Sequence, residues 1–214
     1  MARIDLKVSF AEKDEAKSLG ARWDKDLKTW YIPDGVDASL FAKWLHVPTA
    51  ISDEPEYRIR SINYFIACSH TLCWKCQQQT KVFAFILPEE HQEYIYDDED
   101  EEGYWSNYEA IGTMSNVLKL ELSVWKRLQT FTKLYKPAYS KQAGGRYFMN
   151  HCEHCNATQG DFFMHSEPGG AFFPTTEGEA GRITVYPIAE PFEGNGSMTY
   201  SSVDFLEYMK HDSV

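Results

Sequence analysis

The sequence predicts an α+β protein in two parts. Short apolar patterns in residues 1–46 predict a small β-α-β-β-α domain, and residues 47–57, which contain prolines and acids, predict a linker. Residues 58–214 hold two C-x-x-C pairs, each between strand-like segments. This arrangement predicts a larger α+β domain built around a zinc-ribbon-like four-cysteine site.

Alternation and capping signals define the first elements of the small domain. The segment "IDLKVSF" alternates apolar and polar residues, which predicts a half-buried strand. In "SFAEKDEAKSLG", Ser9 and Glu12 have the spacing of a capping box, acids follow in the first turn, and Gly20 is placed to end the helix. A helix between Ser9 and Gly20 therefore follows the strand.

The rest of the small domain is rich in tryptophan. The segment "ARWDKDLKTWYIP" predicts a hairpin with Trp23 on one arm and Trp30 on the other. The segment "ASLFAKWL" predicts a short helix that places four apolar residues on one face: Leu40, Phe41, Trp44 and Leu45. We expect Trp23, Trp30 and Trp44 to form the hydrophobic centre, because so small a domain needs large side chains.

The same residues carry a family resemblance. The stretch with "LGARWD" followed by "KTWYIPDG" resembles a small bacterial domain of unknown function that is found attached to plasmid-transfer primases and other mobile-element proteins. The resemblance implies an accessory module without known catalytic residues. As an alternative to a core role, Arg22, Lys28, Trp30 and Tyr31 could form a surface on which bases or a peptide stack.

The larger domain mixes strand and helix patterns. The apolar runs "YRIRSINYFIAC" and "TKVFAFILP" predict strands, as do "GGRYFMN" and "ITVYP". The segment "LELSVWKRLQTFTKLYK" predicts a helix, because Val124, Leu128, Phe131 and Tyr135 repeat at helical spacing and Pro137 lies just beyond them. The segment "SSVDFLEYMK" predicts a capped terminal helix.

The four paired cysteines carry the strongest chemical signal. Cys73 and Cys76 repeat the spacing of Cys152 and Cys155, and each pair lies on a polar turn between extended segments. Two such zinc knuckles supply the tetrahedral four-sulfur shell that a structural Zn2+ prefers. The residue after the second cysteine commonly needs a left-handed backbone, which Asn156 tolerates better than Gln77. This part of the chain resembles uncharacterised bacterial proteins with two C-x-x-C knuckles.

Other assignments of these residues stay open at this point. A thioredoxin-like dithiol needs a C-x-x-C at the start of a helix, and a disulfide is disfavoured in a reducing compartment. Cys68 is predicted to be a buried thiol, while His70, His151 or His154 could replace a cysteine ligand. The segment "QGDFFMHSEPGGAFFP" predicts core packing followed by a tight turn, or a loop that presents His165 and Glu167 beside the metal.

Charge and missing motifs narrow the function. The formal net charge is −11, and six consecutive acids form the densest charge in the chain: Asp97, Asp98, Glu99, Asp100, Glu101 and Glu102. Such a run predicts a solvated loop or a negative surface that attracts a basic partner. The sequence lacks the motifs of serine hydrolases, zinc proteases, P-loop proteins, Rossmann proteins and zinc deaminases.

We therefore expect a non-enzymatic, zinc-stabilised acidic binding protein that engages a basic protein partner, as an immunity-type antagonist or as an adaptor. The alternative is a nucleic-acid-binding accessory module of a mobile-element system, and a metalloenzyme with a histidine and carboxylate site is a third hypothesis. No membrane span and no signal peptide are recognisable, so we expect a bacterial cytoplasmic protein without a membrane partner.

Overall fold

The computed structural model describes residues 4–6, 8–9, 12–25, 29–33, 35–41, 43–44, 54–97, 102–200 and 204–213. The chain divides into two compact units, Met1–Glu54 and Pro55–Val214. Most of the predicted linker, residues 47–53, lies outside the described residues. Within the described part of the chain, no helix has the length and apolar character needed to cross a membrane.

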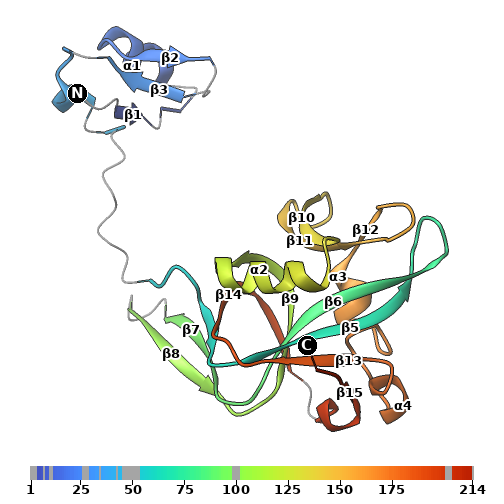
Figure 1. Cartoon of the computed structure of the whole chain (residues 1–214). Coiled ribbons are helices and arrows are strands. Elements are labelled where there is room, and N and C mark those ends of the chain that lie inside the picture. The colour runs from blue at the N-terminus through green and yellow to red at the C-terminus, as the bar shows by residue number, and fades with distance from the viewer. Residues whose placement is uncertain are drawn as a thin grey trace. The chain divides into compact units, whose positions relative to one another are not determined.

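In its described residues, the amino-terminal unit has a three-stranded antiparallel sheet and two short helical segments (Figure 1). Its sheet has the order β1-β3-β2, with β1 at Ile4–Leu6, β2 at Arg22–Asp24 and β3 at Thr29–Ile32. Helix α1 (Lys13–Ser18) follows β1, and Ala38–Phe41 is a 3₁₀ helix, η2. Before α1, the Ser9 hydroxyl donates to Glu12 Oε2 over 2.7 Å, so the two residues with capping-box spacing are in contact.

The small core corrects part of the predicted tryptophan centre. Phe41 and Trp44 are buried, but Trp23 is 47% exposed. Trp30 is half-buried, and its ring and that of Trp23 pack edge to face. Leu40 is also exposed, whereas Trp44, whose amide donates to the Phe41 carbonyl over 2.8 Å in the turn that follows η2, is buried. Leu45 and Lys28 lie outside the described residues.

The carboxyl-terminal unit is sheet-rich with few helices. Among the described residues its main sheet has nine strands in the order β15-β13-β5-β6-β9-β14-β4-β7-β8, all of which except β4 are labelled in Figure 1. In chain order these strands are β4 (Ile59–Ser61), β5 (Tyr64–Leu72), β6 (Gln79–Leu87), β7 (His91–Asp97), β8 (Glu102–Tyr108), β9 (Gly112–Leu120), β13 (Thr184–Ile188), β14 (Phe192–Tyr200) and β15 (Lys210–His211). A second, three-stranded sheet contains β10 (Tyr135–Ser140), β11 (Gly145–His151) and β12 (Thr158–Gln159).

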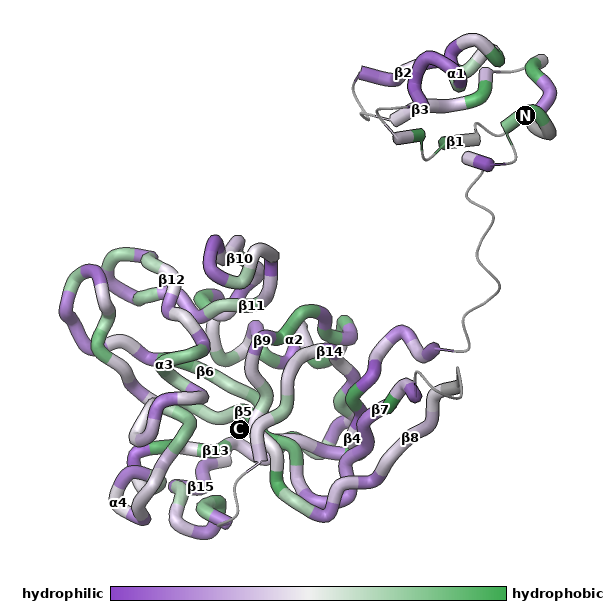
Figure 2. The backbone as a smooth tube through the Cα atoms, turned by 180° about the vertical axis from the view of Figure 1, so that it is seen from behind, coloured by the Kyte–Doolittle hydropathy of each residue, from purple (hydrophilic) through white to green (hydrophobic). Residues whose placement is uncertain are grey.

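Both faces of the main sheet are covered near β6. This explains why the sequence of β6 is apolar at every position from Val82 to Leu87. Phe83, Phe85 and Leu87 join one core with Val124 and Leu128 of helix α2 (Leu122–Phe131). On the other face Val82, Ala84 and Ile86 join a second core that includes Met164 of helix α3 (Asp161–His165). Figure 2 shows the hydrophobic colour along β5 and β6. Burial of each large apolar side chain contributes about 1.5–3 kcal/mol to the stability of this unit.

Two predicted helices are shorter in the structure. Helix α2 ends at Phe131, and Thr132 is extended, so Tyr135 is a buried residue of β10 instead of a helical one. Pro137 lies within β10, which is at the edge of its sheet, where the missing amide costs no ladder hydrogen bond. Near the carboxyl end, the described part of the predicted helix is the 3₁₀ segment η3 (Leu206–Tyr208), followed by β15.

Candidate metal centre

The first cysteine pair lies on the connection between β5 and β6. The backbone amide of Cys73 donates to the Gln78 carbonyl, and the amide of Gln77 donates to the Cys73 carbonyl, each over 2.9 Å. Gln77 has φ +58°, in the left-handed region that the turn requires. Residues 73–78 therefore form a tight knuckle that turns both sulfurs to one side.

The second pair repeats this geometry between β11 and β12. The amide of Cys152 donates to the Ala157 carbonyl and the amide of Asn156 donates to the Cys152 carbonyl, again over 2.9 Å. Asn156 has φ +56°. The left-handed conformation expected after the second cysteine is thus present in both knuckles. Gln77 adopts the same conformation as Asn156, although asparagine tolerates it better.

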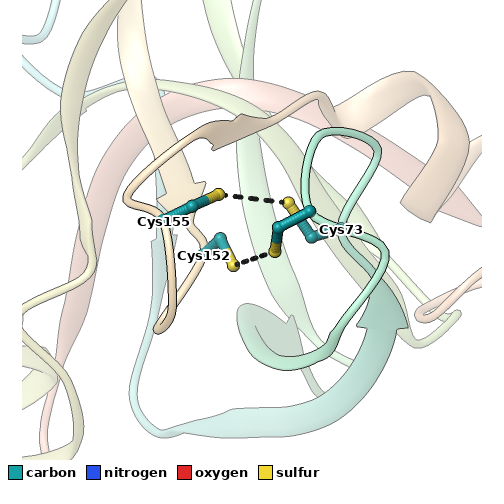
Figure 3. Close-up of side chains that lie close together, drawn as sticks. Cys73, Cys152 and Cys155 are labelled. Atoms are coloured by element: carbon teal, nitrogen blue, oxygen red, sulfur yellow. Dashed lines mark hydrogen bonds between the residues drawn. The ribbon is translucent and has the colours of Figure 1, made fainter.

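The two knuckles face each other and bring all four sulfurs together (Figure 3). The Sγ atoms of Cys73 and Cys155 are 3.6 Å apart, as are those of Cys76 and Cys152, and the four atoms lie within 4.8 Å of one another. A tetrahedral ion with bonds of about 2.3 Å to sulfur requires sulfur separations of about 3.8 Å. The four cysteines are therefore arranged so that they could hold a metal ion.

The thiols influence one another strongly. Burial raises the pKa of Cys73, but the amides of Cys76 and Lys75 and the neighbouring thiols outweigh it and lower that pKa to about 6. The Gln78 amide lowers the pKa of Cys76, but burial and the other thiols raise it to about 12. One thiolate forms easily and the next does not, because like charges repel in so small a space. A bound cation removes this repulsion.

Several polar side chains brace the two knuckles independently of any metal. The Trp74 indole N–H donates to the Thr158 carbonyl over 2.7 Å, which joins the first knuckle to β12. Glu153, inside the second knuckle, accepts from the backbone amide of Lys81 over 2.8 Å. The buried side chain of Asn150 exchanges two hydrogen bonds with the backbone of Phe83, at 2.8 and 2.9 Å. The pattern of the cysteines gave no signal for these contacts.

The other candidate ligands have different environments. Cys68 lies within β5, and burial raises the pKa of its thiol. His151 is buried with Nδ1 beside the carbonyls of Leu134 and Met149, while Nε2 of His154 contacts the Gln79 carbonyl over 2.9 Å. Among the described residues, the group of potential metal ligands consists of the four paired cysteines alone.

His165, which the sequence also allowed in a loop beside the metal, ends helix α3 and has a packing role. His165 is 3% exposed and stacks on Phe172 with ring centres 5.2 Å apart. Glu167 is exposed and begins the tight turn through Gly169 and Gly170. A Cβ on Gly170 would lie 2.6 Å from the Phe163 carbonyl oxygen, so the turn requires glycine there. The predicted tight turn is therefore present, and it brings the backbone of Gly170 close to that of Phe163.

The predicted stacking surface of the small unit is divided between two faces. In the sheet, Arg22 is opposite Tyr31, and Trp23 is opposite Trp30. Successive residues of a strand point to opposite faces, so the structure places Arg22 with Tyr31 on one face and Trp30 on the other. Trp30 packs partly against the small core.

The acidic run connects β7 and β8. Asp97 ends β7 and is directly opposite Glu102, which begins β8, and β8 is an outer strand of the nine-stranded sheet. Asp98, Glu99, Asp100 and Glu101 lie outside the described residues. Residues 89–109 include ten acids and no lysine or arginine: Glu89, Glu90, Glu93, Asp97, Asp98, Glu99, Asp100, Glu101, Glu102 and Glu109.

A concentration of positive charge was not recognised from the sequence. Eight charged residues occur from position 119 to 146, of which seven are basic: Lys119, Glu121, Lys126, Arg127, Lys133, Lys136, Lys141 and Arg146. Lys119 pairs with Glu56, and Arg127 pairs with Glu190. The remaining five cations form no ion pair with a described residue and lie on α2 and around the β10–β11 hairpin. We call these five residues the basic surface: Lys126, Lys133, Lys136, Lys141 and Arg146. A count of charge by segment would have revealed this surface.

Comparison with known proteins assigns the amino-terminal domain. Residues 3–46 match the family described as a domain of unknown function, DUF5710. Over 50 residues the chain is 52% identical to one Escherichia coli protein named DNA primase TraC, and over 42 residues it is 60% identical to another of the same name. These segments are 23% and 20% of this chain and 4% of each primase, so the chain spans only a small part of the relatives it matches. No solved structure matches.

These matches confirm the resemblance noted in the sequence. The first 50 or so residues fit a domain that is attached to plasmid-transfer primases. The four-cysteine site lies outside the matched residues, in the carboxyl-terminal unit.

Proposed function

We propose that this chain is an accessory protein of a plasmid-transfer system and binds nucleic acid through its basic surface, which a structural zinc ion holds in place. The observation that carries the proposal is the concentration of unpaired cations on α2 and the β10–β11 hairpin of a protein whose net charge is −11. Phosphate groups bind to such local surfaces, whatever the sign of the total charge.

The basic surface is a continuous part of the fold. Trp125 of α2 packs edge-on against Phe148 of β11 with ring centres 5.1 Å apart, so the helix and the hairpin are joined. Near the hairpin turn, the exposed Tyr139 is directly opposite Arg146. An exposed aromatic ring beside a guanidinium group is suited to stack on an unpaired base while the cation contacts phosphate.

The proposed zinc ion connects this surface to the main sheet. Strand β11 ends at His151, and Cys152 follows it directly. A zinc-ribbon-like site on Cys73, Cys76, Cys152 and Cys155 therefore holds one end of the basic hairpin against the β5–β6 connection. Four thiolate ligands leave no open coordination position, so the proposed role of the ion is structural.

Fluorescence anisotropy with a labelled single-stranded oligonucleotide tests the proposal across a series of salt concentrations. The association constant K falls as salt is added, and each lost phosphate contact reduces the steepness of log K against log salt by about 0.7. The variant K141Q/R146Q should therefore reduce the steepness by about 1.4. The matched control is R182Q/K210Q, which removes the same two kinds of charge from exposed positions elsewhere in the same unit. No binding at low salt, or equal slopes for both variants, would exclude this role for the basic surface.

A second candidate function is binding of a basic protein partner, as the overall composition predicts. The β7–β8 hairpin supports it, because ten acids without a compensating lysine or arginine lie in residues 89–109. In this proposal the protein is a non-enzymatic adaptor between nucleic acid and a basic protein, and its two charged regions serve different partners. Affinity capture by the wild-type protein and by a variant with the run 97–102 neutralised tests it; equal recovery of basic proteins would argue against this function.

A further inference from the structure

A cavity in the carboxyl-terminal unit combines aromatic walls with carboxylates. It has a volume of about 270 Å³. Its apolar lining includes Phe172, Phe173, Phe205 and Met209, which come from the turn after α3 and from the segment around η3. Three acids also line it, Glu89, Glu109 and Asp204, and no lysine, arginine or histidine is present among the described lining residues. We propose that this cavity binds the side chain of a lysine or arginine from a basic segment of a protein partner.

Strand pairing brings the first two acids to the same place. Glu89 precedes β7 and Glu109 follows β8, and the ladder between those strands begins with His91 opposite Tyr108. The amide of Glu90, whose φ is +66°, donates to the Tyr108 carbonyl over 2.8 Å and closes the base of the hairpin. Neither Glu89 nor Glu109 forms an ion pair with a described residue. The cavity lining therefore carries negative charge that no described ion pair compensates.

A tyrosine at the end of β14 forms one wall. The Tyr200 hydroxyl contacts both Nε2 of the buried His91 and the carboxylate of Glu93, so its polar end is already bonded within the protein. Its ring is parallel to that of Tyr108, with centres 5.1 Å apart. Tyr200 thus contributes a fixed aromatic surface to the cavity, against which the aliphatic stem or cationic head of a ligand can lie.

The chemistry and the size favour a long cationic side chain over other occupants. The three acids do not converge closely enough to form a potential metal-binding group within the described part of the chain. The volume lies just below the range of about 300–1,000 Å³ that is typical of sites for drug-sized ligands. A lysine or arginine side chain places an apolar stem between aromatic rings and its charge among carboxylates, which satisfies both kinds of lining.

The acidic hairpin indicates that this side chain belongs to a protein. The cavity lies at the base of the β7–β8 hairpin, so a basic segment can place one side chain in the cavity while others meet the acids of residues 89–109. The long-range field of these acids favours approach of such a segment. The inference rests on the second candidate function, since it names the site at which a basic partner would be recognised.

Binding of synthetic peptides to the full chain tests the inference. The probes are a short peptide that alternates arginine and glycine, its citrulline analogue, and spermidine as a small-molecule cation. Calorimetric titration of wild type, E89Q/E109Q and the control E167Q/E177Q is compared at one salt concentration, after thermal unfolding has shown that the variants fold. We expect E89Q/E109Q to weaken arginine-peptide binding at least about tenfold and the control at most about twofold.

The possible outcomes separate the cavity from the broader function. Binding of the arginine peptide that E89Q/E109Q and the control weaken equally would overturn the cavity site and leave recognition of a basic partner intact. The absence of any arginine-peptide binding would overturn both. Equal affinity for the citrulline analogue would contradict recognition of a cation, and tighter binding of spermidine would assign the cavity to a small-molecule cation instead of a protein.

Discussion

The double substitution C152S/C155S should remove a large part of the stability of the carboxyl-terminal unit. Cys76 and Cys152 are 76 residues apart in sequence, so a metal that joins them closes a long loop. If the metal restricts the unfolded chain as a covalent cross-link does, the loop entropy is worth about 4.5 kcal/mol at 25 °C. The whole stability of a domain is typically about 5–15 kcal/mol, so the effect should be easy to measure.

Differential scanning calorimetry is the appropriate assay, because it can separate the transitions of the two units. For a unit of this size each kcal/mol corresponds to about 2–4 °C, and the double variant should therefore unfold about 9–18 °C below wild type. Addition of a strong chelator to wild type should have a similar effect, and metal analysis should find one zinc ion per chain before its removal and none after it.

The thiol of Cys68, which is half-buried and not fully buried as predicted, provides a control. Since it lies in β5 outside the four-cysteine group, C68S should cost only about 1 kcal/mol and leave the metal content unchanged. An unfolding temperature that is the same in C152S/C155S as in wild type would refute the reasoning. So would a wild-type protein that is purified without metal and is insensitive to the chelator.

Three further predictions concern buried groups and backbone. Burial raises the pKa of Asp161 from 3.8 to about 6, so its contribution is present below pH 3.8 and is lost as the pH rises through 6. Burial lowers the pKa of His165 from 6.5 to about 4, so its contribution is present above pH 6.5 and is lost as the pH falls through 4. Because D161N lacks the Asp161 effect and keeps that of His165, it should lose about 2 kcal/mol relative to wild type between pH 6.5 and pH 4 in urea unfolding, whereas a constant difference would contradict the assignment. The substitution G170A should cost more than about 2 kcal/mol, since its Cβ would meet three carbonyl oxygens within 2.9 Å, while the control G178A has no atom within 4 Å and should be nearly neutral by the same measurement. Asn156 has a left-handed backbone, so N156G should fold and keep the proposed zinc ion, and N156V should be destabilised by about 1–2 kcal/mol; equal midpoints would show that the turn is not strained.

The spacing of the cysteines predicted the part of the candidate site that would contact a metal ion, namely the four sulfurs and the turns that carry them. Two C-x-x-C pairs implied two knuckles, and Asn156 implied a left-handed turn, because these features depend on local chemistry that the sequence displays directly. The braces that involve Trp74, Glu153 and Asn150 were not predictable. They join residues that are 67 to 84 positions apart, and neither partner has an unusual local pattern.

The sheet-rich character of the larger unit was underestimated for a related reason. Strand β9 contains "GTMSNVLKL" and strand β14 contains "FEGNGSMTY", and both include glycine and asparagine, which are typical of turns. These residues serve the packing: a Cβ on Gly112 would lie 2.3 Å from Met198 Cε, and Asn116 has φ +47°. Asp161 accepts a hydrogen bond from the Asn116 amide over 2.7 Å, so a residue far along the chain supports this irregular backbone. Tertiary contacts thus outweigh local propensity in both strands.

The place of β14 in the sheet has a consequence for the newly synthesised chain. This strand lies between β9 and β4, and it joins the group β15-β13-β5-β6-β9 to the group β4-β7-β8. The β7–β8 hairpin is synthesised roughly 90 residues before β14 is complete, a delay of roughly 5–20 s at about 5–20 residues per second. During that interval β4 and β9 each present an unpaired edge to other chains. Ribosome-associated chaperones that cover such edges should therefore improve the yield of folded protein more than they improve the yield of proteins whose neighbouring strands are consecutive in sequence.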